Sequence, residues 1–333
     1  MIRQNFNADW TVEKGDGNSR MNSFLGNTQT KTVHLPYDAM IHEARTPDTK
    51  NGAQTGFYPG GEYIFQKHFT APQAWQGKQV SLVFEGVYQT ALVYLNGWLL
   101  TRNVNGYAEF TVEAGPYLKY GADNLLKVIA DNSLEPNSRW YTGSGIYRPV
   151  RLLVGNKVYL PQDTVRITTR EVGEGFALLD VTAQVQSAST VTERVTLQQT
   201  ICREGTAVLT DRQNLLLQPG ESRTVSFRYC VDSPALWSPE DPNLYTSIMQ
   251  VLEGEEELDR EETSFGIRTL SIDAAHGVRI NGQTVKLRGA CIHHDNGILG
   301  AATLPDAEER RIRQLKEAGF NAIRSSHHPA GRA

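Results

Sequence analysis

The sequence contains few cysteines and no long run of apolar residues. Its 333 residues include three cysteines, Cys202, Cys230 and Cys291, an odd number with the spacing of neither a zinc site nor a disulfide framework. We therefore expect a protein of a reducing compartment. No apolar stretch approaches the roughly 18 residues that a membrane-spanning helix needs, so we do not expect a membrane as partner.

An excess of charge of one sign is also missing. The formal net charge is −4, which gives no electrostatic reason to expect binding to nucleic acid or to an anionic membrane surface. The first ten residues, MIRQNFNADW, lack the apolar core of a signal peptide. We therefore expect a cytoplasmic protein, unless a leader has been removed.

Long helical patterns are absent from the first half of the sequence. Short runs of alternating apolar and polar residues, separated by turn residues, predict strands at 63–69, 80–85, 91–95, 125–130 and 150–154. The pair Asn96-Gly97 after the third run is a strong hairpin signal. This spacing predicts a jelly-roll β-sandwich over residues 1–155.

A second all-β stretch follows over residues 156–268. Its expected strands include 165–168, 178–185, 195–197, 224–229 and 244–249. About seven strands in roughly 110 residues are typical of an immunoglobulin-like sandwich. The acidic run at 253–257 is interpreted as a solvated hairpin turn.

The periodicity changes after residue 268. We expect a strand at 285–292, a helix at 305–318 with Ile312, Leu315 and Ala318 facing a core, and a strand at 320–324. This pattern predicts that residues 269–333 are the first β-α-β unit of a TIM barrel, which needs about 250 residues in all. We therefore expect the chain to be truncated. Its tail should be disordered, packed on the second sandwich or buried in a dimer.

A histidine-rich loop follows each strand of the β-α-β unit. His293-His294-Asp295 follows the first strand, and Ser325-Ser326-His327-His328 follows the second. A β-α-β crossover makes its strands parallel, so both loops should emerge at the sheet edge where barrels place their active sites. Arg324, at the end of the second strand, offers a fork of N–H donors for carboxylates or hydroxyls.

The two loops admit two other interpretations. Imidazole and carboxylate groups bind metals, but the spacing resembles no known zinc pattern and adjacent histidines rarely bind one ion, so no metal site is expected here. A single histidine could equally well hydrogen-bond the loop backbone. For two such loops side by side, part of an active site is the favoured interpretation.

Two segments resemble the barrel-opening motifs of glycoside hydrolase family 2, which holds β-galactosidases, β-glucuronidases and β-mannosidases. These are residues 281–295 and 312–329. Further similar segments follow the order expected for the family: 58–69, 84–97, 138–148 and 236–245. The resemblance therefore covers nearly the whole chain.

The resemblance implies a retaining glycosidase, in which two carboxylates about 5–5.5 Å apart act as acid/base and nucleophile. In this family both are glutamates on later barrel strands, so we expect them beyond Ala333 and expect this chain alone to be inactive. His293 and His327 match histidines that contact the sugar, and Arg324 matches an arginine that braces the catalytic carboxylates. Asp295 is a further candidate. Arg139 stands where several relatives have a sugar-binding aspartate, so its role is open.

The run 293–302 looks most like bacterial β-galactosidases, so we expect the N-terminal part of an exo-acting enzyme that hydrolyses terminal β-galactosides. A β-glucuronidase or β-mannosidase is the alternative within the family. A non-catalytic carbohydrate-binding module and a metallohydrolase are alternatives of other classes. The expected partner is a carbohydrate, and no cofactor is expected in this segment. A divalent metal and a homo-oligomer stay open for the full enzyme. Trp140, Tyr141 and Tyr58 could stack on sugar rings, although packing is favoured.

Overall fold

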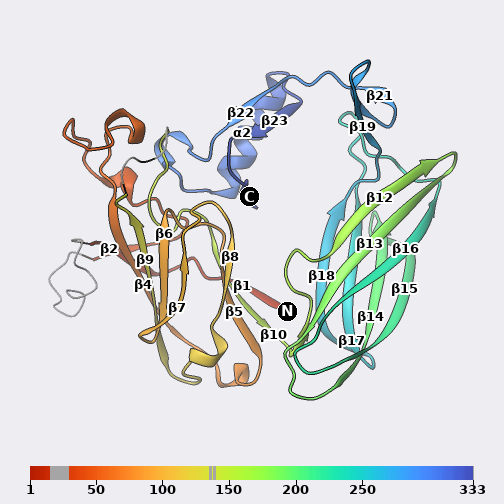
Figure 1. Ribbon diagram of the computed structural model, residues 1–333, viewed down its shortest axis with the longest axis horizontal. Coiled ribbons are helices and arrows are strands. Elements are labelled where there is room, and N and C mark those ends of the chain that lie inside the picture. The colour runs from red at the N-terminus through yellow and green to blue at the C-terminus, as the bar shows by residue number, and fades with distance from the viewer. Residues whose placement is uncertain (16–29, 135–136, 138–139, 333) are drawn as a thin grey trace. The chain divides into compact units, whose positions relative to one another are not determined.

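The computed structural model describes residues 1–15, 30–134, 137 and 140–332, and it is mainly β, as expected (Figure 1). The contacts within the chain divide it into two compact units. One combines Ile2–Val154 with Gly289–Ala333, and the other combines Met1 with Gly155–Arg288. No helix in the described ranges is both long and apolar enough to cross a membrane.

Two sheets form a sandwich in the unit that contains Ile2–Val154. The six-stranded sheet is antiparallel, and its strands in spatial order are β3 (Lys31–Val33), β2 (Trp10–Lys14), β4 (Gly61–Thr70), β9 (Asp123–Asn132), β6 (Thr90–Leu95) and β7 (Trp98–Asn103). The four-stranded sheet has the order β1 (Ile2–Asn5), β10 (Val150–Gly155), β5 (Gln79–Phe84) and β8 (Phe110–Glu113).

The alternating pattern of β4 explains how the six-stranded sheet lies. Tyr63 and Phe65 belong to the main core, whereas Ile64, between them, belongs to a small apolar cluster with Leu92 and Ile129. Successive residues of a strand point to opposite faces, so both faces of this sheet bury apolar side chains. This alternation, which repeats every two residues, allowed the strands to be predicted from the sequence.

The predicted hairpin at Asn96-Gly97 is confirmed. It joins β6 to β7, and its two residues have φ values of 53° and 90°, the left-handed conformation that a tight hairpin turn requires. The Asn96 side chain also accepts a hydrogen bond from the Leu125 amide at 3.1 Å, which ties the turn to β9.

The second unit contains a sandwich of two four-stranded sheets around its own apolar core. In one sheet β13 (Phe176–Ser187) pairs with β11 (Val158–Tyr159), β12 (Arg166–Gly173) and β16 (Ser222–Asp232). The other has the order β15 (Thr206–Leu217), β14 (Glu193–Arg203), β17 (Tyr245–Glu253) and β18 (Glu256–Phe265). A small sheet of β19 (Leu270–Asp273), β20 (Gly277–Ile280) and β21 (Gln283–Thr284) completes this unit.

The sequence did not reveal β15 and β18. Both lie at the edges of their sheet and are largely exposed, so they carry polar and charged side chains that blur the apolar alternation. The acidic run at 253–257 is the exposed turn between β17 and β18, as predicted, with Gly254 at a φ of 61°.

The predicted β-α-β unit is present at the end of the chain. It consists of β22 (Gly289–Ile292), α2 (Pro305–Glu317) and β23 (Ala322–Ser325), and β22 pairs with β23 in parallel. A Cβ atom on Gly289 would lie 2.5 Å from the Ala322 carbonyl oxygen, so the close approach of the two strands requires glycine there. Short 3-10 helices lie at Met40–His42, Gly52–Thr55, Gln73–Trp75, Gly115–Tyr117 and Gly297–Leu299.

Two expectations about this tail are wrong. The apolar stripe of α2 does not face a core within the part of the chain that the structure describes, because Ile312 is 43% exposed. The tail is also not disordered, because it contains β22, α2 and β23. It forms one compact unit with the first sandwich, at one end of which Figure 1 shows β22, β23 and α2.

A buried carboxylate joins the tail to the first sandwich. Asp38 is 1% exposed and accepts hydrogen bonds at both oxygens. Its Oδ2 accepts from the Ala301 amide of the tail at 2.9 Å and from the Tyr141 hydroxyl at 2.6 Å. Its Oδ1 accepts from the Met40 and Ser144 amides, each at 3.0 Å. Burial raises the pKa of Asp38, and its four hydrogen bonds oppose that shift.

Two glycines make room for this contact. A Cβ atom on Gly300 would lie 2.2 Å from Asp38 Oδ2, and one on Gly143 would lie 2.5 Å from the Ala301 Cβ atom. Both glycines also have left-handed φ values, 61° and 69°. A side chain at either position would therefore separate the tail from the carboxylate.

Asp38→Ala should loosen the tail. It leaves three buried amides and one hydroxyl without their acceptor, and we expect a loss of about 2–3 kcal/mol in the stability of this unit. Hydrogen exchange measured by mass spectrometry should show faster exchange in β22 and β23. Asp123→Ala is the control, since that carboxylate is 63% exposed and pairs with an exposed histidine. Equal exchange in the two variants would show that Asp38 does not hold the tail.

Candidate functional site

The two histidine loops lie side by side at the carboxyl ends of β22 and β23, as predicted. The ring centroids of His293 and His327 are 6.3 Å apart. Trp140, from the first sandwich, lies edge-on to both, with centroid distances of 4.8 Å to His293 and 6.0 Å to His327. Three segments distant in sequence thus contribute one cluster of rings.

Polar atoms of this cluster are buried without a partner. Within the described ranges, Trp140 Nε1 and His293 Nδ1 are shielded from solvent and make no hydrogen bond. Buried polar atoms in native proteins nearly always have partners, so an unpartnered pair marks a place where a polar group from elsewhere could bind.

The structure places the other predicted site residues near the cluster. Arg324 lies on β23, opposite Cys291 of β22, and is exposed. Asp295 is half-buried, two residues beyond His293 in the same loop. Among the described residues, neither side chain forms a hydrogen bond or ion pair with His293 or His327. Arg139 lies outside the described residues.

His294 has a different role from its neighbour His293. It is 7% exposed, and its Nε2 donates to the Thr142 carbonyl oxygen at 2.8 Å. Burial lowers the pKa of His294 to about 4, so the ring is neutral at pH 7. His294 therefore attaches the first loop to the segment that carries Trp140. His293, by contrast, packs against Trp140 and His327.

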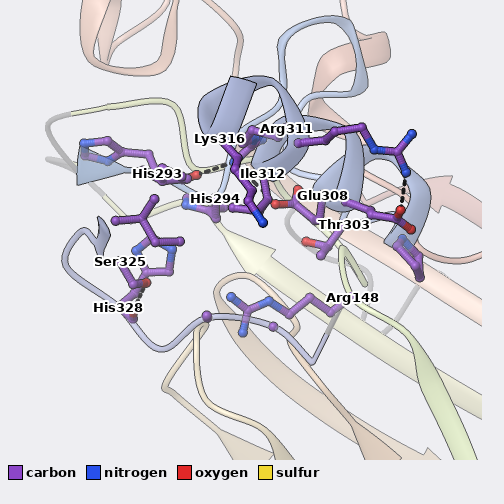
Figure 2. Close-up of a pocket in the computed structure, with 17 residues that line it drawn as sticks. Arg148, His293, His294, Thr303, Glu308, Arg311, Ile312, Lys316, Ser325 and His328 are labelled. Carbon is purple, nitrogen blue, oxygen red and sulfur yellow. Dashed lines mark hydrogen bonds and ion pairs between the residues drawn. The ribbon is translucent and has the colours of Figure 1, made fainter. Parts of the chain in front are cut away.

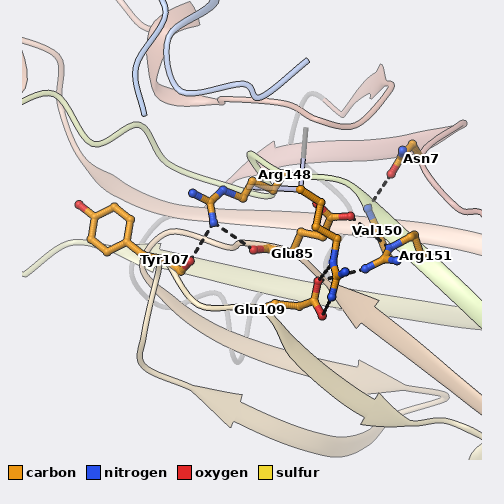
Figure 3. A network of polar contacts seen from close by, with 8 residues as sticks. Asn7, Glu85, Tyr107, Glu109, Arg148, Val150 and Arg151 are labelled. Atoms are coloured by element: carbon orange, nitrogen blue, oxygen red, sulfur yellow. Dashed lines mark hydrogen bonds and ion pairs between the residues drawn. The ribbon is translucent and has the colours of Figure 1, made fainter. Parts of the chain in front are cut away.

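The buried side chain of Arg148 hydrogen-bonds the main chain that follows the second loop. It is 2% exposed, and its guanidinium donates to the Tyr107 carbonyl oxygen at 2.8 Å (Figure 3). It also donates to the Pro329 carbonyl oxygen at 2.8 Å. His328 packs against Tyr107, with ring centroids 4.8 Å apart. Burial, followed by the nearby Arg148 charge, lowers the pKa of His328.

An ion-pair network lies beside Arg148 (Figure 3). Arg151 pairs with Glu85 at 3.1 Å and with Glu109 at 3.0 Å. Arg332, from the end of the tail, donates twice to Glu109, at 2.7 and 2.9 Å. Burial raises the pKa of Glu85, and the Arg151 charge opposes that shift. The network adds a second attachment of the tail to the sandwich.

Arg311 is a site residue that the sequence did not single out. It projects from α2 and donates to the carbonyl oxygens of His293 and Asp295, at 3.0 and 2.8 Å. It stands in a helix rich in charged residues, and nothing in the sequence marks the one arginine that turns inward. Asp38 and Thr142 were missed for the same reason, since each acts through a contact between distant segments.

A pocket of about 660 Å³ lies next to the two histidine loops (Figure 2). Its lining comes from the loops, from α2 and from the first sandwich, and includes His293, His294, His328, Arg148, Arg311 and Ile312. In the part of the chain that the structure describes, no group of three or more histidine, cysteine, aspartate or glutamate side chains could hold a metal ion.

Acidification should destabilise this unit through His294. The folded-state pKa of about 4 lies below the ordinary 6.5, so the unfolded chain binds the proton more readily between these values. The stabilisation is complete above pH 6.5 and is lost as the pH falls toward 4, by roughly 2 kcal/mol at pH 5. Urea unfolding at pH 7 and pH 5 should show a smaller loss for His294→Gln than for wild type. His68→Gln, which alters a 66% exposed histidine, should keep the wild-type difference. A wild-type difference in His294→Gln would contradict the assignment.

Comparisons with known proteins agree over the whole chain. Residues 10–166 match the family model for the glycosyl hydrolase 2 galactose-binding domain-like region, and residues 158–268 match that of glycosyl hydrolases family 2. A β-galactosidase of Bacteroides ovatus is 36% identical over 98% of this chain and 38% of its own length. A putative β-glucuronidase of Formosa agariphila is 31% identical over 98% of this chain and 31% of its own length.

Solved structures show the same fold. A glycosyl hydrolase family 2 member from Bacteroides cellulosilyticus has a TM-score of 0.94 at 33% identity, covering 100% of this chain and 44% of that one. A β-glucuronidase of Bacteroides uniformis has a TM-score of 0.89 at 27% identity, covering 99% of this chain and 40% of that one. The chain thus spans less than half the length of these relatives. The family indicated by the motifs around the two histidine loops is confirmed, and the chain belongs to glycosyl hydrolase family 2.

Proposed function

We propose that this chain is the N-terminal segment of a retaining exo-β-glycosidase acting on terminal β-galactosides, with the two histidine loops as one wall of its sugar subsite. The observation that carries the proposal is the cluster of His293, His327 and Trp140 at the carboxyl ends of two parallel strands. Barrel enzymes bind their substrates at this end of their strands. On this proposal β22, α2 and β23 begin the catalytic barrel.

The groups of the cluster suit the recognition of a sugar. An imidazole carries one donor and one acceptor when neutral, which matches a hydroxyl, and the indole N–H is a further donor. The buried, unpartnered Trp140 Nε1 and His293 Nδ1 are available for such contacts. Hydrogen bonds to sugar hydroxyls that strengthen in the oxocarbenium-like transition state would lower the barrier to hydrolysis.

Arg324 and Asp295 complete the proposed wall. Arg324 is exposed on β23, where its guanidinium could brace a carboxylate supplied by another strand. Asp295 could accept a hydrogen bond from a sugar hydroxyl. The catalytic acid/base and nucleophile are assigned to residues outside this chain, so the chain contributes sugar recognition without the reaction centre.

A β-galactoside is the favoured substrate because the B. ovatus relative, at 36% identity, is a β-galactosidase. A putative β-glucuronidase and a β-glucuronidase among the relatives, at 31% and 27% identity, make a β-glucuronide the second candidate. Comparing kcat/KM for the two nitrophenyl glycosides with the full-length protein distinguishes these candidates.

The full-length protein should hydrolyse a nitrophenyl β-galactoside with retention of anomeric configuration, because the family mechanism passes through a covalent intermediate. An NMR time course of the released sugar should show the β-anomer first. The purified 333-residue chain, as the control, should show no turnover above buffer. First appearance of the α-anomer, or turnover by the chain alone, would contradict the proposal.

His293→Ala and His327→Ala should each lower kcat/KM of the full-length protein by roughly 10- to 100-fold, the expected cost of one lost hydrogen bond to the sugar in the transition state. The control is His276→Ala, which removes a 59% exposed histidine of the other unit. Wild-type kcat/KM in both loop variants would exclude these histidines from the sugar subsite.

A further inference from the structure

The Arg311 side chain donates two hydrogen bonds to the main chain of the first histidine loop. It lies within α2, and its Nη1 donates to the His293 carbonyl oxygen at 3.0 Å (Figure 2). Its Nη2 donates to the Asp295 carbonyl oxygen at 2.8 Å. These two carbonyls flank His294, so one planar guanidinium fixes the backbone on both sides of that residue.

The direction of this side chain is specific to its position on the helix. Arg311 is 19% exposed and has the Glu308 carboxylate, one turn earlier, 3.5 Å from its Nη1. Arg313, two residues later, points into solvent with 67% exposure and pairs with Glu309. The hydrogen bonds to the loop are therefore specific to Arg311 and are not shared by Arg313 on the same helix.

The first loop is held from two directions. On one side His294 donates to the Thr142 carbonyl oxygen of the first sandwich at 2.8 Å. On the other side Arg311 reaches it from α2. With its backbone restrained on both sides, His293 presents its ring to Trp140 at a centroid distance of 4.8 Å.

We propose that Arg311 is a positioning residue of the sugar subsite, which sets the placement of His293 and Asp295 without touching the sugar. This inference rests on the proposed function of the loop. A displacement of about 1 Å in a substrate-positioning group can cost a factor of about 100 in rate. Lysine keeps the charge of Arg311 but lacks the planar fork that reaches two carbonyls at once.

A double-mutant cycle in the full-length protein tests the inference, with kcat/KM for a nitrophenyl β-galactoside as the measurement. Arg311→Lys should lower kcat/KM about 10-fold. In a background with His293→Ala and Asp295→Ala, the same change should cost less than about 2-fold, because Arg311 then has no sugar-contacting side chains to place. Arg313→Lys, the matched control on the same helix, should leave kcat/KM unchanged in both backgrounds.

A loss of purely structural origin would appear equally in both backgrounds. Equal losses, or no loss from Arg311→Lys in an active protein, would overturn the inference while leaving the proposed function intact. An unchanged kcat/KM in the His293→Ala, Asp295→Ala background would overturn both. Thermal unfolding establishes that the variants are folded. If Arg311→Lys does not fold, Arg311→Gln, which keeps one amide donor, replaces it in the same cycle with the same outcomes.

Discussion

The site depends on one carboxylate buried between segments that are far apart in the sequence. Asp38 accepts a hydrogen bond from Ala301, 263 residues later, while its other bonds hold the 141–144 segment of the first sandwich. An unpaired carboxylate at this depth would be costly, so each of its hydrogen bonds contributes to keeping it buried. The segment that contains Trp140 and the continuation of the loop that contains His293 are therefore joined by the same carboxylate.

The polar side chains around this contact fall into two groups. Some hydrogen-bond the main chain of the loops or of the sandwich, and others have buried polar atoms without a partner. His294, Arg148 and Arg311 direct their hydrogen bonds to main-chain carbonyls of the loops or of the sandwich. His293 and Trp140 instead keep buried polar atoms without a partner in the described part of the chain. The adjacent histidines His293 and His294 thus differ in their contacts, since His294 hydrogen-bonds the Thr142 carbonyl oxygen and His293 packs against Trp140.

The sequence predicted the fold well where the signal was local. Strand alternation located the central strands, Asn96-Gly97 located a hairpin, and the β-α-β pattern correctly predicted two parallel strands with histidine loops at one edge. The edge strands β15 and β18 were not predicted, because their exposed side chains are polar and lack the alternation of apolar residues. Asp38, Thr142 and Arg311 could not be predicted, since their roles come from contacts between distant segments and no periodic pattern marks them. The docking of the tail on the first sandwich was missed for the same reason, although the neighbouring loops and their rings were foreseen.

The division of the first unit into Ile2–Val154 and Gly289–Ala333 bears on synthesis as well as on structure. A chain emerging from the ribosome exposes Asp38 long before Ala301 exists, so the carboxylate must wait for the 155–288 segment to be translated. Until then it can meet its donors from residues 40, 141 and 144 but not the amide of the tail. Closing so long a loop adds an entropic cost and makes completion of this unit a late event in folding. The cluster of His293, His327 and Trp140 is consequently completed only after the intervening sandwich has been made.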